Sequence, residues 1–183
     1  ADNNFFSVFS FPLILNSSKA LSDPNAIAIS ETMATKFFGN VNCIGKTLQM
    51  QEGDKQHAFH ISAVFRKVPG QSTLQFDFVI PFERFLADNP WALETGSTSN
   101  ETWIVLKNTA DPKKLEAKIK NLIIKQESTL NQELMLFPLS DKLLYRYAGG
   151  QRVWGEMQTV VIVGAIGFAI LLIACFNFIN LSI

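Results

Sequence analysis

Hydrophobic and polar positions follow one pattern up to Glu156 and a different one after it. Up to that residue, apolar side chains alternate with polar ones or recur at helical spacing, and charged side chains are common. The segment from Met157 to Ile183 contains no Asp, Glu, Lys or Arg. As a helix rising ~1.5 Å per residue, it would exceed the hydrocarbon core of a membrane, which is about 30 Å thick. We therefore predict a globular domain over residues 1–156 and one transmembrane helix over residues 157–183.

The globular part shows interspersed strand and helix patterns. Ser30 is a suitable N-cap for the helix that follows it, and Gly39 can end that helix in the left-handed conformation. Asp111 and Pro112 mark another helix start. The segments expected to be strands are residues 27–30, 47–51, 58–68, 74–80, 102–107 and 134–139. Because helices and strands mix without a strict βαβ repeat, we predict an α+β fold with a mixed sheet.

Some side-chain placements follow from these patterns. The polar stretch Tyr147–Gln151 is expected to lead directly into the membrane helix. The helix after Asp111 should bury one face. That face consists of Leu115, Ile119, Leu122 and Ile123. The strand over residues 58–68 should place four apolar side chains on one face. These are Phe59, Ile61, Ala63 and Phe65.

The apolar segment Phe5–Leu15 has the length of a signal-peptide core but lacks its flanks. Asp2 precedes it, and no Lys or Arg occurs before Lys19. A signal peptide has a basic leader and a small-residue cleavage site. We interpret the segment as buried structure, and the chain, which has no initiator methionine, as a piece of a longer protein.

Charge and cysteine content exclude some classes of function. The net charge is zero, and the aromatic residues lie within apolar alternations rather than among basic residues. We therefore do not expect a nucleic-acid partner. Cys43 lies in the globular part and Cys175 inside the apolar run, so we expect two small buried residues and no disulfide.

The segment Gly39–Thr47 looks like a phosphate-binding P-loop, but it has one residue too many between its glycines. A P-loop follows a strand and opens a helix, so that backbone amides face the phosphates. Here a helix pattern precedes the segment and a strand pattern follows it. We interpret it as a helix-to-strand turn, and we do not expect this chain to bind ATP.

No other residue pattern indicates catalysis. His57 and His60 are three apart on a predicted strand and would point to opposite faces, so a shared metal site is not expected. For Asp77 we expect a solvent-facing or loop-capping role. Because no nucleophile, histidine and acid pattern is present either, we assign no catalytic residue, metal site or cofactor to the chain. We do not expect it to be an enzyme.

The apolar run contains small and polar residues on one side. At ~100° per residue, Gly167, Ala174 and Asn177 fall within roughly 80° of arc. Gly164 lies beside this face, and Asn180 extends its polar character toward the far end. Small residues let helices approach closely, and an amide in a membrane seeks a partner helix. We therefore predict packing against other membrane helices, with a lone anchor as the alternative.

The charges beside the helix say little about its orientation. Lys142, Arg146 and Arg152 precede it, which alone would place that side in the cytoplasm. Because long domains cross membranes largely regardless of charge, we give this signal little weight.

Several segments together resemble one family of membrane proteins. In chain order they are Phe5–Leu13, Asn25–Glu31, Lys36–Gly39, Ile44–Leu48, Ala63–Pro69, Phe76–Pro81 and Leu172–Ser182. They resemble the periplasmic core domain and second membrane helix of macrolide-exporter-like (MacB/FtsX-type) ABC transporter permeases, in the form common among Bacteroidetes. The resemblance covers nearly the whole chain. Cys43 departs from the pattern, because the family often has proline before the Ile-Gly-Lys, and this affects only a turn.

The resemblance implies an extracytoplasmic domain, with residues 1–156 in the periplasm and the helix in the bacterial inner membrane. It implies that a separate cytoplasmic ABC ATPase hydrolyses ATP and that the permease transmits the movement to the domain for export or extraction of a substrate. The implied partners are this ATPase, other permease helices in a permease dimer, membrane lipid and a periplasmic adaptor.

Two other functions stay open on the sequence. One is a membrane-anchored sensor domain that drives a cytoplasmic kinase or cyclase. The other is a regulator of a periplasmic cell-wall hydrolase. Further membrane spans after Ile183 would favour the permease, and a dimerising coiled coil would favour the sensor.

Overall fold

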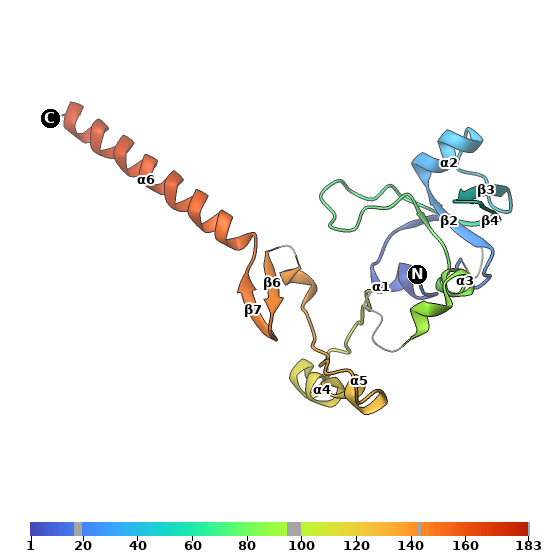
Figure 1. Ribbon diagram of the computed structural model, residues 1–183. Helices are drawn as coiled ribbons and strands as arrows, with labels where there is room; N and C mark the ends of the chain where they lie inside the picture. The colour runs from blue at the N-terminus through green and yellow to red at the C-terminus, as the bar shows by residue number, and fades with distance from the viewer. Residues whose placement is uncertain (17–19, 95–99, 143, 183) are drawn as a thin grey trace. The chain divides into compact units, whose positions relative to one another are not determined.

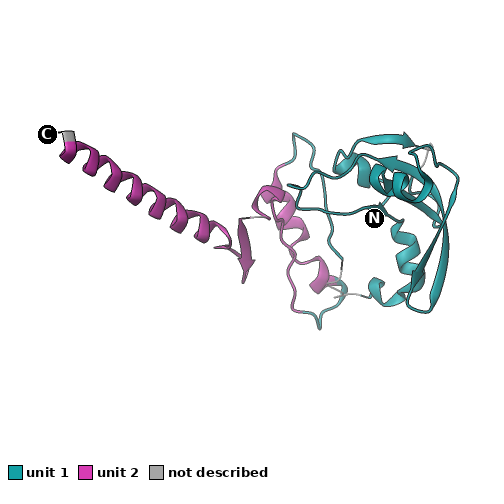
Figure 2. Ribbon diagram, turned by 90° about the horizontal axis from the view of Figure 1, so that it is seen from above, with its two compact units in different colours: residues 1–110, 126–130 teal, residues 111–125, 131–183 magenta. Residues whose placement is uncertain are grey.

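The computed structural model describes residues 1–16, 20–94, 100–142 and 144–182 (Figure 1). The chain divides into two units, residues 1–110 with 126–130 and residues 111–125 with 131–183 (Figure 2). The first unit contains α1 (Phe5–Val8), β1 (Leu13–Asn16), β2 (Ala26–Ser30), α2 (Glu31–Phe38), β3 (Thr47–Glu52), β4 (Lys55–Phe65), β5 (Phe78–Val79), α3 (Phe82–Asp88) and the 3₁₀ turn η1 (Pro90–Leu93). The second contains α4 (Pro112–Ile119), most of α5 (Leu122–Gln126), η2 (Leu139–Asp141), β6 (Tyr145–Ala148), β7 (Gln151–Trp154) and α6 (Met157–Ser182).

Strand β4 organises the sheet of the first unit. It pairs antiparallel with β1 and β3 and parallel with β2, while β5 adds antiparallel to β2. The resulting order is β1-β4-β2-β5, with β3 also beside β4. The mixed strand directions and the interspersed helices confirm the predicted α+β class, and α6 supplies the predicted long apolar helix (Figure 1).

A β-bulge in β4 corrects one predicted placement. Ile61 pairs with Ile27 and Ala63 pairs with Ala28, so Ser62 is an extra residue in β4. An extra residue reverses the alternation of side chains beyond it. The buried Ser62 hydroxyl is hydrogen-bonded to the Ala20 carbonyl. The four apolar residues expected on one face are therefore divided, Phe59 and Ile61 on one side and Ala63 and Phe65 on the other.

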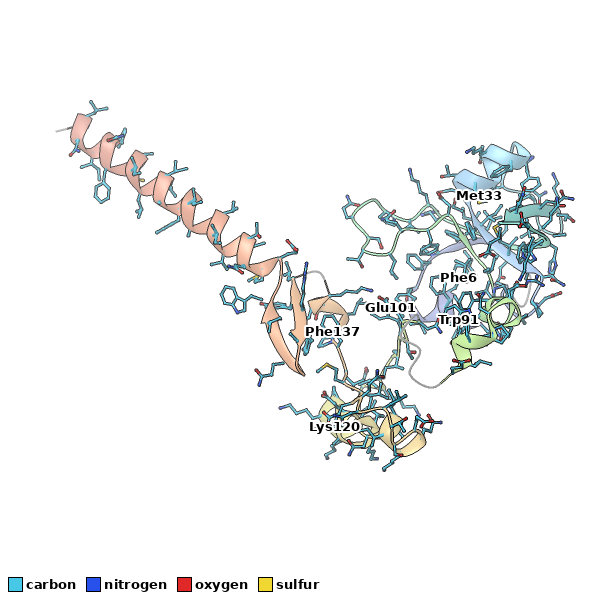
Figure 3. All side chains as sticks on the ribbon, in the orientation of Figure 1. Phe6, Met33, Trp91, Glu101, Lys120 and Phe137 are labelled. Atoms are coloured by element: carbon cyan, nitrogen blue, oxygen red, sulfur yellow. The ribbon has the colours of Figure 1, made fainter. Side chains whose placement is uncertain are left out.

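The sheet consequently buries a cluster on each face. The cluster beside α2 contains Ile27, Ile29, Ala34, Cys43, Phe59, Ile61 and Val64, with Met33 and Phe38 of α2 packed against it. The other contains Leu21, Ala28, Ala63, Phe65, Val68 and Val79. Phe5, Phe6, Phe11 and Leu13 pack against this second cluster, which confirms that the N-terminal apolar segment is part of the folded structure. Figure 3 labels Met33, which packs against the cluster beside α2, and Phe6, which packs against the other cluster.

Helix α2 begins and ends as the sequence predicts. The Ser30 hydroxyl accepts a hydrogen bond from the Met33 amide at 3.1 Å, and Gly39 closes the helix with φ of 78°. The Ser30 hydroxyl also donates to the Asp77 carboxylate at 3.1 Å, and the Ser30 amide donates to the Asp77 carbonyl at 2.8 Å. Asp77 therefore supports the cap of α2, in line with its predicted capping role.

Several predicted elements are absent or shorter. Residues 102–107 and 134–139 form no strand in the described structure, and the strand expected over 74–80 is reduced to β5. Alternation marks which side chains can face a core, whereas a strand also requires a neighbouring backbone to pair with. The helix expected after Asp111 is divided at Lys120 (labelled in Figure 3), whose carbonyl accepts a hydrogen bond from the Leu134 amide at 2.9 Å.

Candidate functional site

Helix α6 is the one helix in the described part of the chain that is long and apolar enough to cross a membrane. Its apolar window has a mean hydropathy of 2.8, and none of that window is buried in the structure. By its length, composition and exposure, α6 could span a membrane. Phe168, Ile170 and Leu171 point in different directions and are each more than half exposed. Such a helix needs apolar surroundings on all sides.

The predicted packing face lies along this helix. Gly164 and Gly167 leave open surface, since a Cβ on either would meet no other group within 4 Å. Ala174 and Asn177 continue the face, and Asn180 lies near its end. All five are brought onto one continuous helix, which is what a packing surface requires. Their contact with a partner helix stays a prediction.

The stretch before α6 is a β-hairpin rather than the polar connection expected over Tyr147–Gln151. Strands β6 and β7 pair antiparallel, with Tyr145 opposite Trp154 and Tyr147 opposite Arg152. Gly149 and Gly150 form the turn, both with positive φ, of 58° and 78°. A two-residue turn of this kind requires positive φ at both positions, which glycine adopts without strain. The Gly-Gly pair after alternating tyrosines was the signal in the sequence that could have predicted this hairpin.

The hairpin is joined directly to the start of α6. The Met157 amide donates to the Leu144 carbonyl at 3.0 Å, and Arg146 pairs with Glu156 at 3.3 Å. Gly155 lies against the first strand, because a Cβ there would meet the Arg146 Cγ at 3.1 Å and the Leu144 carbonyl oxygen at 3.2 Å. The hairpin and the start of α6 are therefore held together by contacts of Glu156 and Met157 and by the close approach of Gly155.

One face of the hairpin is aromatic. The Arg152 guanidinium lies over the Tyr145 ring, 3.5 Å from its centroid, and pairs with Asp141 at 3.3 Å. Phe137, labelled in Figure 3, packs edge-on against Tyr147 with ring centroids 4.7 Å apart. Both tyrosines are thus half-buried by their neighbours, whereas Trp154 on the same face is 61% exposed.

The P-loop-like segment is confirmed as a helix-to-strand turn. Gly39 ends α2, and Thr47 begins β3. Between them Cys43 is buried in the core, and Gly45 has φ of 79°. Burial raises the pKa of the Cys43 thiol above its ordinary value. The segment has no helix after it to receive a phosphate, so its geometry differs from that of a P-loop.

His57 belongs to a polar cluster that attaches α3 to β4. Arg84 of α3 donates from Nη2 to His57 Nδ1 at 2.5 Å, and its Nε lies 3.2 Å from Asp88. Lys55 also pairs with Asp88, at 3.4 Å. Within the described residues no three His, Cys, Asp or Glu side chains lie close enough together to hold a metal ion. The cluster contains a single carboxylate between cations, an arrangement suited to joining two elements.

The first unit also has a hollow of about 450 Å³ beside its N-terminal segment. Its wall is mainly apolar and includes Phe5, Phe9, Phe82 and Trp103. Phe5 and Phe9 contact each other, and Phe9 contacts Trp103, through rings 5.2 and 5.7 Å apart. The same wall also carries the carboxylates Asp2 and Glu101.

Comparisons with known proteins find a family and a solved structure that are similar to this chain. The family described as MacB-like periplasmic core domain matches residues 1–122. A crystal structure of a domain of a permease protein from Porphyromonas gingivalis is similar, with a TM-score of 0.51 and 23% sequence identity. The similarity covers 78% of this chain and 69% of that one and supports the fold. No curated protein matches the chain.

Proposed function

Because the chain belongs to the family of MacB-like periplasmic core domains, we propose that it is part of a permease subunit of an ABC transporter. The observation that carries this proposal is the order of parts on one chain. A family domain over residues 1–122 is followed by α6, an uncharged helix with no cover in the structure. A membrane-spanning helix accounts for α6, and the domain then lies on the periplasmic side of the bacterial inner membrane.

The energy for transport comes, in this proposal, from a separate cytoplasmic ATPase. The P-loop-like segment Gly39–Thr47 has the wrong order of elements to hold a nucleotide phosphate. The chain instead offers a mechanical connection. The Met157–Leu144 hydrogen bond and the Arg146–Glu156 ion pair hold the hairpin to α6, so movement of the helix would displace the hairpin with it. The function is mechanical transmission for export or extraction of a substrate, without chemistry in this domain.

Helix α6 would receive that movement from other permease helices in a dimer. The face with Gly167, Ala174 and Asn177 suits such contacts because small side chains allow close approach and an amide can hydrogen-bond across. A matched pair of substitutions tests this face. Ala174 and Ala165 are nine residues apart, which is ~180° around the helix at ~100° per residue. Ala174→Leu should lower transport-coupled ATPase activity several-fold, while Ala165→Leu should leave it near the native level. Equal activities would contradict the assignment of the face.

The intact parent protein tests the function itself. We expect gentle detergent extraction from native membranes, followed by mass spectrometry, to recover a stoichiometric P-loop ATPase. Recovery with a cell-wall hydrolase, or with a histidine-kinase output domain on the same chain and no ATPase, would contradict the permease proposal. Those results would support one of the two other functions, and a periplasmic adaptor among the recovered proteins would extend the assembly.

A further inference from the structure

We propose that the aromatic face of the β6–β7 hairpin lies in the lipid headgroup layer and sets the depth of α6 in the membrane. This inference rests on the proposed function, in which α6 crosses the membrane. It assigns the hairpin an interaction surface whose partner is the headgroup layer of the same membrane. The residues that carry it are Tyr145, Tyr147, Arg152 and Trp154.

These four residues share one face because they are opposite one another in the hairpin register. Tyr145 is opposite Trp154, and Tyr147 is opposite Arg152. Residues directly opposite in an antiparallel pair lie on the same side of the ribbon. The other side carries Val153 and Gln151, which are not aromatic. The hairpin therefore presents two chemically different faces.

Trp154 is the exposed aromatic residue among these four. Its side chain is 61% exposed, although the tyrosines beside it are half-buried under Arg152 and Phe137. An indole combines a large apolar ring with one N–H donor, so it prefers a boundary between an apolar phase and water. Tryptophan and tyrosine are enriched at membrane–water interfaces for this reason. Arginine beside them can bind lipid phosphate oxygens.

The distance along the chain fits the same boundary. Trp154 lies three residues before Met157, where α6 begins. The polar residues Gln158 and Thr159 occupy the first turn, so the hydrocarbon core would begin near Val160. From Met157 to Val160 the helix rises ~4.5 Å. A headgroup layer is about 5–8 Å thick on each side, so Met157 falls within it, and the end of β7 is three residues before Met157. A core of ~20 residues starting there would end just before Asn180.

Because the hairpin is connected to α6, its contact with the headgroup layer would also restrict the helix. The Met157–Leu144 hydrogen bond and the Arg146–Glu156 ion pair fix the hairpin to the first turn of the helix. A hairpin held at the headgroup layer would therefore resist movement of α6 along the membrane normal. The hairpin and the helix would tilt or rotate together, at a depth that the headgroup layer sets.

Spin-label depth measurements on the intact permease in phosphatidylcholine–phosphatidylglycerol vesicles test the proposal. Nitroxide labels are placed singly by Trp154→Cys, Gln151→Cys and Ala169→Cys, and collisions with oxygen and with a water-soluble nickel chelate are compared. We expect position 169 to be shielded from the chelate and position 151 to be fully accessible. Position 154 should be intermediate, with a chelate collision rate several-fold below that of position 151.

The outcomes separate this proposal from the one on which it rests. Equal chelate access at positions 154 and 151 would place the hairpin in water and overturn the headgroup contact, while α6 still spans. Shielding of position 154 from both colliders would indicate a protein partner and would also overturn it. Chelate access at position 169 would instead contradict the membrane-spanning helix.

A second measurement places the label outside the hairpin and tests the side chain of Trp154. With the label at Thr159, Trp154→Ala should shift the collision ratio of oxygen to chelate, and Trp154→Tyr should restore it. A merely structural role for the side chain would not distinguish alanine from tyrosine in label depth once both variants are folded. An unchanged ratio in both variants would overturn the role of Trp154 in setting depth.

Discussion

The sheet of the first unit and helix α6 contain similar apolar residues, but these residues are buried in the sheet and exposed in the helix. Ile27 and Ile29 of β2 are 0% exposed, whereas Ile170 and Ile173 of α6 are 62% and 61% exposed. In the sheet, the buried apolar side chains find their partners within the same unit. In α6 none of the apolar window is buried within the described structure, and in the proposed permease lipid and other helices would surround it. Whether an apolar residue is buried thus depends on its surroundings, and for α6 the proposed permease assigns that role to the membrane.

The largest expected effect compares two phenylalanines. Phe65 is fully buried and contacts Phe6 and Phe76, while Phe168 of α6 is 63% exposed. Phe65→Ala should lower the free energy of unfolding of the first unit by about 3–5 kcal/mol, because it removes a buried ring and leaves a cavity. Phe168→Ala should change it by less than about 0.5 kcal/mol. Denaturant unfolding of the intact protein in detergent measures both free energies. Similar losses of stability in the two variants would contradict the difference in burial between Phe65 and Phe168.

An arginine at an exposed position of α6 should have a different effect from an arginine at an exposed position outside α6. Leu171 of α6 and Leu139 of η2 are 58% and 52% exposed. Leu171→Arg should disfavour membrane insertion by about 2.5–3.5 kcal/mol, since the middle of a spanning helix loses its apolar surroundings. Leu139→Arg should leave insertion unchanged. Carbonate extraction of membranes reports the inserted fraction, and equal extraction of the two variants would count against a spanning α6.

Removing the N-cap of α2 should have a smaller, local effect on the stability of the first unit. Ser30 accepts from the Met33 amide and donates to Asp77, so Ser30→Ala removes a cap and leaves the carboxylate without this donor. We expect a loss of about 1–2 kcal/mol in the free energy of unfolding of the first unit. Thr32→Ala, in the exposed first turn, is the control and should cost less than about 0.5 kcal/mol. A Ser30→Ala variant as stable as the control would show that the cap contributes little.

Adding one methyl group at Gly155 should weaken the connection between the hairpin and α6. A Cβ at Gly155 would lie 3.1 Å from the Arg146 Cγ and 3.2 Å from the Leu144 carbonyl oxygen, closer than ordinary contact. Gly155→Ala should therefore loosen the Met157–Leu144 hydrogen bond and speed hydrogen exchange of the Met157 amide. Gly70→Ala is the control, because a Cβ there meets nothing within 4 Å. Unchanged exchange in Gly155→Ala would indicate that the strand yields without disturbing this connection.

The smallest effect concerns the Cys43 thiol. Burial raises its pKa, so the reactive thiolate is scarce at neutral pH and increases only toward alkaline pH. A water-soluble maleimide should leave Cys43 unlabelled in the native protein and label it after denaturation, as mass spectrometry can show. Phe65→Ala should increase labelling in dilute denaturant. Rapid native labelling at neutral pH would contradict the buried placement of Cys43.

Features set by neighbouring residues could be predicted from the sequence, and those set by distant residues could not. Ser30, Gly39 and the start of the long apolar helix depend on local capping and on an uninterrupted run, so the sequence pattern located them. The bulge at Ser62 depends on β2 and on the Ala20 carbonyl, which are far away in the chain. Alternation alone therefore divided the faces of β4 incorrectly.

The hairpin and the unpaired segment over residues 102–107 show the same limit. Alternation over 102–107 predicted a strand, but strand formation depends on a pairing backbone that the pattern does not supply. The hairpin was missed because its polar composition was taken as a connection, although Gly149–Gly150 had the right turn chemistry. The resemblance predicted the family, while the packing face on α6 rests on helical geometry and awaits a test.

The most direct test of the account is the sidedness of α6 in the intact parent protein. Single cysteines are introduced at Gln71, in the sheet unit, and at Ser182, at the end of α6, in a background without other reactive cysteines. The account predicts that a membrane-impermeant maleimide added to spheroplasts labels position 71 and labels position 182 only after the membrane is permeabilised. Labelling of both positions in intact spheroplasts would contradict a membrane-spanning helix and with it the permease proposal.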